Sequence, residues 1–173
     1  MAHASLEMPY FIKASINLSE SEKEEKYRII KESLGALLDH NSSVQMKMVT
    51  INCIMKTHLP YCYWVGFYVI QNEILEVGPY QGTLGCLQIE LGKGVCGSVA
   101  ISGRTKIVDE VHSLAQGTEH IACDPNSQSE IVVPVYGPDQ KLIAVFDVDS
   151  SLTHSFSEVD KNNLEEIMTT YFS

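Results

Sequence analysis

Several common signatures are missing from this chain of 173 residues. Positive charge is scarce, because 12 lysines and arginines stand against 22 aspartates and glutamates, a net charge of −10. An acidic surface repels the phosphate backbone, so we expect no nucleic-acid partner. No apolar run approaches the roughly 20 residues that a membrane span needs, and residues 1–11 lack the basic flank and apolar stretch of a secretory signal. We therefore expect a soluble, cytoplasmic protein without membrane association.

The chain also has no CxxC pair, although it has five cysteines. This absence argues against a thioredoxin-type site or a zinc ribbon, and an odd number of thiols argues against a fixed disulfide framework. Cys53 and Cys62 lie among apolar neighbours on expected regular elements, so we interpret them as inert core thiols. The candidates for thiol chemistry are Cys86, Cys96 and Cys123, which lie in a long irregular segment.

No internal repeat and no Ser- or Gly-rich linker interrupts the sequence, which predicts one domain over 19–173 after a loosely held arm, 1–18. Apolar residues at three-four spacing predict a helix that is capped at Ser19 and ends at His40. Two further helices are expected, one over about 43–58 and one that closes the chain, with Ser155 and Glu158 or Ser157 and Asp160 as its cap.

Between these helices lie segments rich in aromatic and β-branched residues, which suit a half-buried sheet. A turn or loop is expected at 78–82, and 137–140 reads as a hairpin loop. Helices at both ends with strands and short turns between them predict an α+β fold, with a mainly antiparallel sheet and helices on one face. The expected strands cover 61–70, 73–78, 86–90, 106–111, 131–136 and 142–148.

Three carboxylates are expected at one end of this sheet. Asp147 and Asp149 alternate along a strand, so their side chains share a face. Pairing of the last two strands through the 137–140 loop places Glu130 opposite Asp147. Because the flanking residues are apolar, we interpret the three acids as a cluster at the border of the core, where proximity raises the pKa of at least one.

Two of the loop cysteines have neighbours that favour a thiolate. Cys96 lies just before an expected short helix, whose N-terminus stabilises negative charge, and Cys123 follows His120 by three residues. A thiolate that attacks a polarised sulfur becomes a sulfenic acid, and a second thiol then condenses with it to a disulfide. With a protonated carboxylic acid and an apolar wall, for which we select Trp64, these parts suit the reduction of a sulfoxide.

Zinc binding is the competing use of the soft side chains. Their spacing lacks the short pairs typical of structural zinc sites, so we expect no metal and no other cofactor. The side chains in question are Cys86, Cys96, His112, His120 and Cys123.

Six segments that include these residues resemble one known family. They are YWVGFY (63–68), GPYQG (78–82), GKGVCG (92–97), HIACD (120–124), SEIVVP (129–134) and DVDS (147–150), and they span about 61–160. In this order they resemble the free methionine-(R)-sulfoxide reductases, which are built on a GAF domain. The resemblance implies a six-stranded antiparallel sheet with helices on one side and a lid of loops over a pocket on the other. It also implies free L-methionine (R)-S-oxide as substrate and thioredoxin as reductant.

The resemblance implies the site residues as well. It places the three redox cysteines at Cys86, Cys96 and Cys123, and substrate-binding residues at Trp64, Tyr80, Glu130, Asp147 and Asp149. We assign Cys123 as the nucleophile and Cys86 as the resolving thiol, with Cys96 as the alternative for either role. Glu130 and Asp149 would polarise or protonate the sulfoxide oxygen, and Asp147 would bind the amino group.

Two departures and two open questions accompany this assignment. Tyr63 and Tyr80 stand where relatives are expected to have Asn and Phe, and the stretch 113–119 is longer and more polar than the family pattern. A GAF sensory module that binds a small ligand without catalysis is the alternative function, although such a module needs no loop cysteines. The two N-terminal helices could form a homodimer interface or cover the sheet.

Overall fold

The computed structural model describes residues 16–114 and 123–173. Its strands form one antiparallel sheet in the order β3-β2-β1-β6-β5-β4, which confirms the predicted α+β class and six-stranded sheet. The elements are α1 (Glu20–Leu37), α2 (Val44–His58), β1 (Trp64–Gln71), β2 (Ile74–Gln81), β3 (Gln88–Glu90), α3 (Gly94–Ser102), β4 (Lys106–Val108), a 3-10 turn (Val111–Ser113), β5 (Ser129–Tyr136), β6 (Leu142–Ser150) and α4 (Glu158–Phe172).

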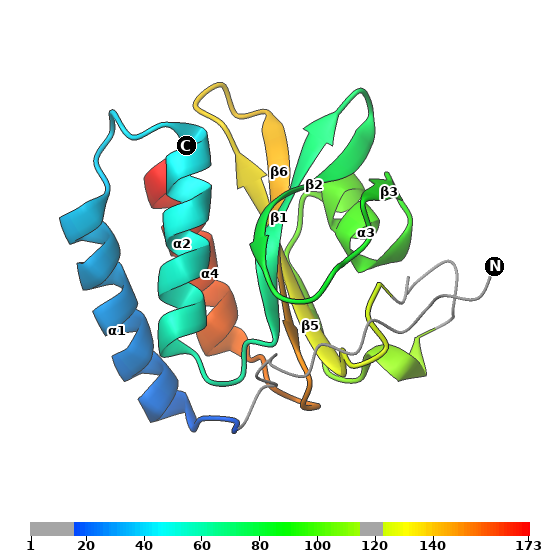
Figure 1. The fold of residues 1–173 in the computed structure, drawn as a ribbon, viewed down its shortest axis with the longest axis horizontal. Helices are drawn as coiled ribbons and strands as arrows, with labels where there is room; N and C mark the ends of the chain where they lie inside the picture. Colours follow the sequence, from blue (N-terminus) through cyan, green and yellow to red (C-terminus); the bar gives the residue numbers. More distant parts are fainter. Residues whose placement is uncertain (1–15, 115–122) are drawn as a thin grey trace.

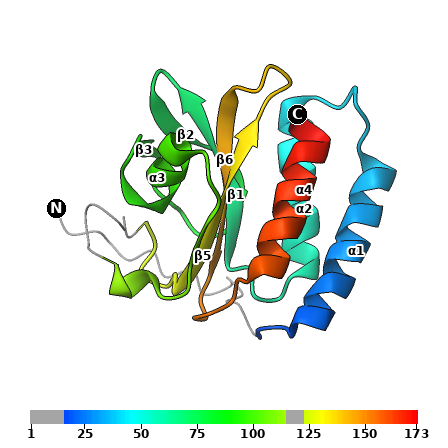
Figure 2. The ribbon, with the colours of Figure 1, turned by 180° about the vertical axis from the view of Figure 1, so that it is seen from behind.

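The sheet separates two layers that are unequal in size (Figure 1). Helices α2 and α4 lie against one face and α1 packs on both of them, as the view from behind also shows (Figure 2). The short helix α3 lies on the opposite face, so that face carries a helix as well as the expected loops. Among the described residues, none of the helices has the length and apolar character that crossing a membrane requires.

Both faces of the central strands are buried, which explains why their sequences are apolar almost throughout. Alternation along β1 sends Phe67 into the core beneath the long helices and sends Trp64 and Tyr68 into a second core beneath α3. The second core contains Cys96 and borders Cys86 and Cys123. The strand period therefore places the aromatic residues and the thiols on one side of the sheet.

Helix caps follow the predicted local chemistry. The Glu22 backbone N–H donates to Ser19 Oγ (3.4 Å) and the Ser19 N–H donates to Glu22 Oε2 (2.8 Å), a complete capping box. At α4 the box is formed by Ser157 and Asp160, one of the two predicted pairs. Helix α1 ends at Leu37 instead of His40, because Leu38 already has an extended backbone.

The loop expected at 78–82 is instead strand β2 as far as Gln81. A Cβ atom on Gly78 would lie 2.9 Å from Val69 Cγ2 and 3.0 Å from the Phe67 carbonyl oxygen, so glycine permits close strand contact here. The register shifts between Gly66 and Tyr68, where a bulge accommodates Pro79 within the sheet. The Gly-Pro pair therefore bends a strand without ending it.

The register of β5 against β6 also differs from the prediction. Glu130 lies opposite Asp149, and Asp147 lies opposite Val132. The hairpin loop and a register shift between Val135 and Tyr136 together move the pairing by two residues. An even shift keeps every side chain on its face, so the three predicted acids still point to the same side of the sheet.

The interpretation of Cys53 as a core thiol is wrong, whereas Cys62 is buried as predicted. The buried stripe of α2 runs through Met48, Ile51 and Met55. Residue 53 lies off this stripe, so its thiol is exposed to solvent.

A buried ion pair joins α1 to α4. Lys23 Nζ lies 2.6 Å from Asp160 Oδ2 and also donates to the Ser155 carbonyl oxygen (2.8 Å). The hydroxyl groups of Tyr27 and Tyr61 donate to Asp160 Oδ1 at 3.0 and 2.6 Å. The carboxylate thus accepts hydrogen bonds from α1, from the segment that leads into β1 and, through Ser157, from the N-cap of its own helix α4.

Replacing Lys23 by Met should lower the free energy of unfolding by about 3–5 kcal/mol, because it leaves the Asp160 charge buried without its partner. Urea unfolding at neutral pH measures the change. The matched control is Lys31→Met, which removes a surface pair with Glu166 and should cost less than about 1 kcal/mol. Equal effects of the two substitutions would show that the buried pair does not hold α1 in place.

Candidate active site

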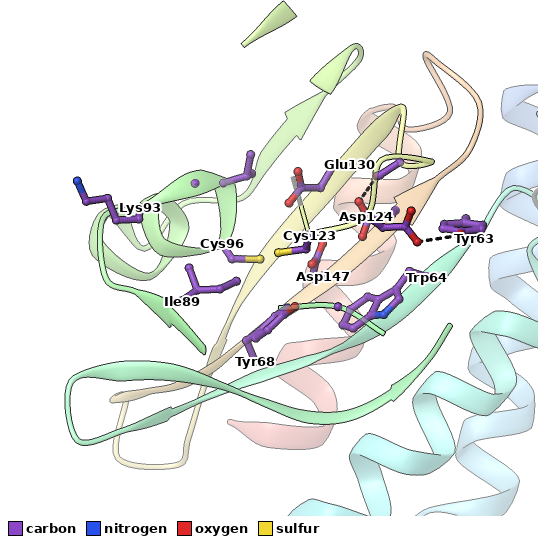
Figure 3. Close-up of a pocket in the computed structure, with 15 residues that line it drawn as sticks. Tyr63, Trp64, Tyr68, Ile89, Lys93, Cys96, Cys123, Asp124, Glu130 and Asp147 are labelled. Carbon is purple, nitrogen blue, oxygen red and sulfur yellow. Dashed lines mark hydrogen bonds between the residues drawn. The ribbon is translucent and has the colours of Figure 1, made fainter. Parts of the chain in front are cut away.

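A small cavity lies on the α3 side of the sheet, between β1, β5, β6, α3 and two loops (Figure 3). Its walls combine aromatic rings, carboxyl groups and sulfur atoms. The lining residues are Tyr63, Trp64, Tyr68, Gly85, Ile89, Lys93, Gly94, Val95, Cys96, Cys123, Asp124, Ser127, Glu130, Asp147 and Asp149.

Trp64, at the start of β1, forms the aromatic wall. Its ring stacks on those of Tyr68 and Tyr80, with centroid distances of 5.7 and 5.2 Å. The stack requires Gly66, because a Cβ atom there would lie 2.4 Å from Tyr80 Cβ and 2.6 Å from Trp64 Cη2. The indole N–H donates to the Thr83 carbonyl oxygen (3.0 Å), which fixes the ring.

The predicted aromatic residues divide between the cavity and its support. Trp64 lines the cavity, and Tyr80 stacks on it without reaching the lining, so the role of Tyr80 in binding stays a prediction. Tyr63 and Tyr68 also line the cavity, whereas from the sequence we select Trp64 alone for the apolar wall. Tyr68 follows Trp64 by four residues on a strand, and this even spacing was a readable sign that both side chains share one face.

The three predicted acids come together at the floor of the cavity. Glu130 on β5 faces Asp149 on β6, and Asp147 lies two residues earlier on β6. Glu130 and Asp147 are each only 6% exposed. Ser127 Oγ donates to Asp149, whereas Asp147 Oδ1 is buried and has no hydrogen-bond partner among the described residues. The floor therefore holds one oxygen that a donor from a bound molecule could satisfy.

The acids are too close and too buried to ionise together. Burial raises the pKa of Glu130 well above its ordinary value, and the charge of Asp149 adds to the effect. Burial, together with the charges of Asp149 and Glu130, raises the pKa of Asp147 well above its ordinary value too. Burial raises the pKa of Asp149 to about 7, against the hydrogen bond from Ser127. At neutral pH the cluster consequently contains carboxylic acids that can donate protons.

The loop cysteines, far apart in sequence, meet at this cavity. Cys86 and Cys123, separated by 37 residues, form a disulfide with a Cα–Cα distance of 5.0 Å. Cys96 in the first turn of α3 is a buried free thiol. Its sulfur and that of Cys123 both point into the space above Asp147 (Figure 3). Cys96 and Cys123 thus line the cavity, and Cys86 is joined to it through the disulfide.

The expectation that the α3 N-terminus favours a Cys96 thiolate is wrong. Burial raises the pKa of this thiol well above its ordinary value, and the negative potential of Asp147 and Glu130 adds to it. Desolvation and like charge outweigh the dipole of a short helix. His120, the proposed neighbour of Cys123, lies outside the described residues, as does 115–119 of the expected lid.

Asp124 is a site residue to which the sequence assigned no role. Its Oδ2 accepts hydrogen bonds from the Tyr63 hydroxyl (2.8 Å) and from Thr83 Oγ1, and its Oδ1 accepts from the Asn126 backbone N–H (2.8 Å). Burial opposes ionisation, but the hydrogen bonds from Thr83, Asn126 and Tyr63 lower the pKa of Asp124 below its ordinary value. A permanent carboxylate therefore stands next to Cys123.

The ligand set considered for zinc is not assembled in the described part of the chain, because Cys86 and Cys123 are bonded to each other. The ligand atoms of Cys96, Glu130 and Asp147 do lie within 4.8 Å of one another. These are the same groups that form the floor of the cavity. The donor set is thus shared with whatever small molecule the cavity takes up.

The chain is similar to known proteins in sequence and in fold, although no family model matches its sequence. The free methionine-R-sulfoxide reductase of Escherichia coli is 31% identical over 146 residues, which cover 84% of this chain and 86% of the relative. A structure of fRMsr from Staphylococcus aureus in its reduced form has a TM-score of 0.76 and 37% identity, and covers 83% of this chain and 90% of that one. Free methionine-R-sulfoxide reductase from Neisseria meningitidis, in complex with its substrate, has a TM-score of 0.74, 30% identity and coverage of 91% and 90%.

The pKa of Asp149 makes the stability of the fold depend on pH. From about pH 4 to about pH 7 the folded protein holds a proton at Asp149 that the unfolded chain has released. The free energy of unfolding should therefore fall as pH rises, by about 1.4 kcal/mol per pH unit for each proton so held. Asp149→Asn should flatten this slope in urea unfolding across the range. Asp139→Asn, at an exposed hairpin position, should leave the slope unchanged; the same slope in all three proteins would contradict the assignment.

Proposed function

Because the chain belongs to the free methionine-R-sulfoxide reductase family, whose fold is the GAF domain, we propose that it reduces free L-methionine (R)-S-oxide to L-methionine. The observation that carries the proposal is the Cys86–Cys123 disulfide beside a buried acid cluster that an indole ring closes. A sensory module needs a ligand pocket but no pair of thiols at its mouth. The combination therefore favours an enzyme over the alternative of a binding module.

Substrate binding uses the contrast between the aromatic wall and the acid floor. The methyl group of the sulfoxide packs on Trp64, whose ring Tyr80 stacks against. The ammonium group of the amino acid pairs with Asp147, whose unpartnered Oδ1 then gains a donor. A cation at this point favours the ionised carboxylate, so binding itself expels the proton from Asp147. A methionine sulfoxide residue within a polypeptide has no such ammonium group, which makes the free amino acid the preferred substrate.

In the first chemical step the Cys123 sulfur attacks the sulfoxide sulfur while Glu130 and Asp149 protonate or polarise the oxygen. The oxygen passes from the substrate to Cys123: the sulfoxide is reduced to the thioether, and the thiol is oxidised to a sulfenic acid. The raised pKa values of the two acids support this role, because a carboxylic acid that is still protonated at neutral pH can donate.

In the second step the Cys86 thiol attacks the sulfenic sulfur of Cys123. A disulfide forms and the oxygen leaves as water. The product is the Cys86–Cys123 bond of this structure. A dithiol reductant then returns both cysteines to thiols and is itself oxidised to a disulfide; we propose thioredoxin for this role.

Cys96 is the alternative nucleophile. Its raised pKa argues against it in the empty cavity, since the thiolate is the attacking form. If it reacted first, its sulfenic acid would condense with the Cys123 thiol to a Cys96–Cys123 disulfide, with loss of water. The Cys86 thiol would then have to attack Cys123 and release the Cys96 thiol before the observed disulfide could form. Identifying the first oxidised sulfur decides between the two thiols.

Turnover is measured as NADPH consumption with thioredoxin, thioredoxin reductase and free methionine-(R)-sulfoxide. The wild type should turn over, and Cys123→Ser should lose at least about a thousandfold, because the nucleophile is gone. Cys53→Ser is the matched control, since that thiol is exposed on α2, and it should keep full rate. A wild type without turnover would remove the proposed reaction, and an active Cys123→Ser protein would overturn the nucleophile alone.

In a Cys86→Ser protein, one equivalent of substrate should leave a sulfenic acid on Cys123, because the resolving thiol is absent. Dimedone labelling followed by peptide mass spectrometry locates this group. The Cys86→Ser/Cys96→Ser double variant should be labelled at Cys123 to the same extent. Dimedone label on Cys96 in the single variant would reassign the nucleophile to Cys96. A double variant without label on Cys123 would do the same.

A further inference from the structure

Asp124 belongs to the loop of Cys123 and accepts a hydrogen bond from Thr83 in the loop of Cys86. We propose that Asp124, Thr83 and Tyr63 form a hydrogen-bonded clamp that keeps Cys86 and Cys123 within bonding reach after reduction and so favours formation of their disulfide. The three are positioning residues that act through the cysteines. The proposal rests on the proposed function for its role in turnover, but the clamp itself can be measured without substrate.

The contacts join two segments that are distant in sequence. Asp124 directly follows Cys123, and Thr83 precedes Cys86 by three residues. Thr83 Oγ1 donates to Asp124 Oδ2, so one hydrogen bond connects the loop of each cysteine to that of the other. The Tyr63 hydroxyl donates to the same oxygen at 2.8 Å, as the dashed line in Figure 3 marks. The clamp thus bridges the loops at a second point besides the disulfide.

The clamp is attached to the rigid part of the molecule. Tyr63 is 1% exposed, and its backbone N–H donates to the Asp149 carbonyl oxygen (2.7 Å). Its own carbonyl oxygen accepts from Lys56 Nζ on α2 (2.7 Å). The Thr83 carbonyl oxygen accepts from Trp64 Nε1 (3.0 Å). Tyr63 directly precedes β1, and Thr83 is hydrogen-bonded to Trp64, the first residue of β1. Two of the three clamp residues are therefore attached to the start of this strand.

The other side of the carboxylate is also occupied. Asp124 Oδ1 accepts from the backbone N–H and the side-chain amide of Asn126 at 2.8 and 2.9 Å. Four donors around one carboxylate stabilise its charge, and they lower its pKa against the effect of burial. Hydrogen bonds to an ionised acceptor are stronger than neutral ones. The clamp consequently stays charged and closed at neutral pH.

Holding two thiols together changes the equilibrium of their oxidation. Free loops lose conformational entropy when a disulfide joins them, and any contact that has already restricted them reduces this loss. The two equilibria are linked. If closing the clamp raises the equilibrium constant for disulfide formation by some factor, forming the disulfide raises the equilibrium constant for closing the clamp by the same factor. Neither hydroxyl belongs to the hydrogen-bond ladder of the sheet, so removing one should alter the loops and leave the fold intact.

The test is the equilibrium of the Cys86–Cys123 disulfide in dithiothreitol redox buffers, read by thiol alkylation and peptide mass spectrometry, without substrate. Tyr63→Phe and Thr83→Val should each lower the equilibrium constant for disulfide formation about tenfold, since each loses one hydrogen bond to a charged group. A tenfold change in this two-electron couple corresponds to about 30 mV, so the potential should become less negative by that amount.

Tyr61→Phe is the matched control. It also removes a buried hydroxyl that donates to a carboxylate, in this case Asp160 Oδ1 at 2.6 Å, on the helix side of the sheet. It should lower the free energy of unfolding and leave the disulfide potential at the wild-type value. A loss of stability alone would not change the potential. The control therefore separates an effect on stability from an effect on disulfide formation.

A kinetic readout extends the test to turnover. After one equivalent of methionine-(R)-sulfoxide, Thr83→Val should accumulate several times more dimedone-reactive Cys123 than the wild type, because Cys86 reaches the sulfenic acid more slowly. Potentials of Tyr63→Phe and Thr83→Val that equal the wild-type value, or an equal shift in Tyr61→Phe, would overturn the clamp. A shifted potential in a protein without sulfoxide turnover would instead remove the proposed function and leave the clamp in place.

Discussion

The pairing of β5 with β6 gathers three carboxyl groups on one face of the sheet, with Glu130 and Asp147 buried and Asp149 half-buried. The chemistry of the site depends on this pairing. Glu130 lies opposite Asp149, and the two-residue period of β6 returns Asp147 to the same face. Three ionised carboxylates cannot share a buried floor, so the group retains protons at a pH where exposed acids have lost theirs. Proton donation and attraction of a cation are thus two consequences of one strand register.

The sulfur chemistry depends on loops instead of strands. Cys86 and Cys123 lie in segments outside the strands, and these segments meet through the disulfide and through the Asp124 carboxylate. Trp64 connects the two systems, since its ring forms the wall above the acids and its N–H binds the loop of Cys86. The loop that carries Cys86 therefore also holds the indole ring in place.

The helix side of the sheet serves a different purpose. Its core is apolar around one enclosed ion pair, Lys23 with Asp160, which joins the first and last helices. Helix α4 packs on β5, which carries Glu130, and α2 packs on β1, which pairs with β6. The strands that carry the acids therefore have little freedom to shift register. A rigid layer on one face allows the other face to hold mutually repelling groups and the loops that carry the thiols.

The sequence by itself determined most of the elements and the face of the sheet on which the acids lie. Helix caps at Ser19 and Ser157 and the alternation at Asp147 and Asp149 are local properties, and each agrees with the structure. Departures occurred where neighbours in space decide. The strand through Gly78 needs a partner backbone in close contact, and the exposure of Cys53 depends on which face of α2 meets the sheet.

Only the tertiary structure decided the state of the site. The N-terminal position of Cys96 predicts an easily formed thiolate, but burial raises the pKa of this thiol, and the acids beneath it add to the effect. These acids lie close to Cys96 in space and far away in sequence. The partners of Asp124 likewise come from residues 63 and 83. Local periodicity could name the chemical groups, whereas burial and distance, which set their charges and partners, exist only in the folded chain.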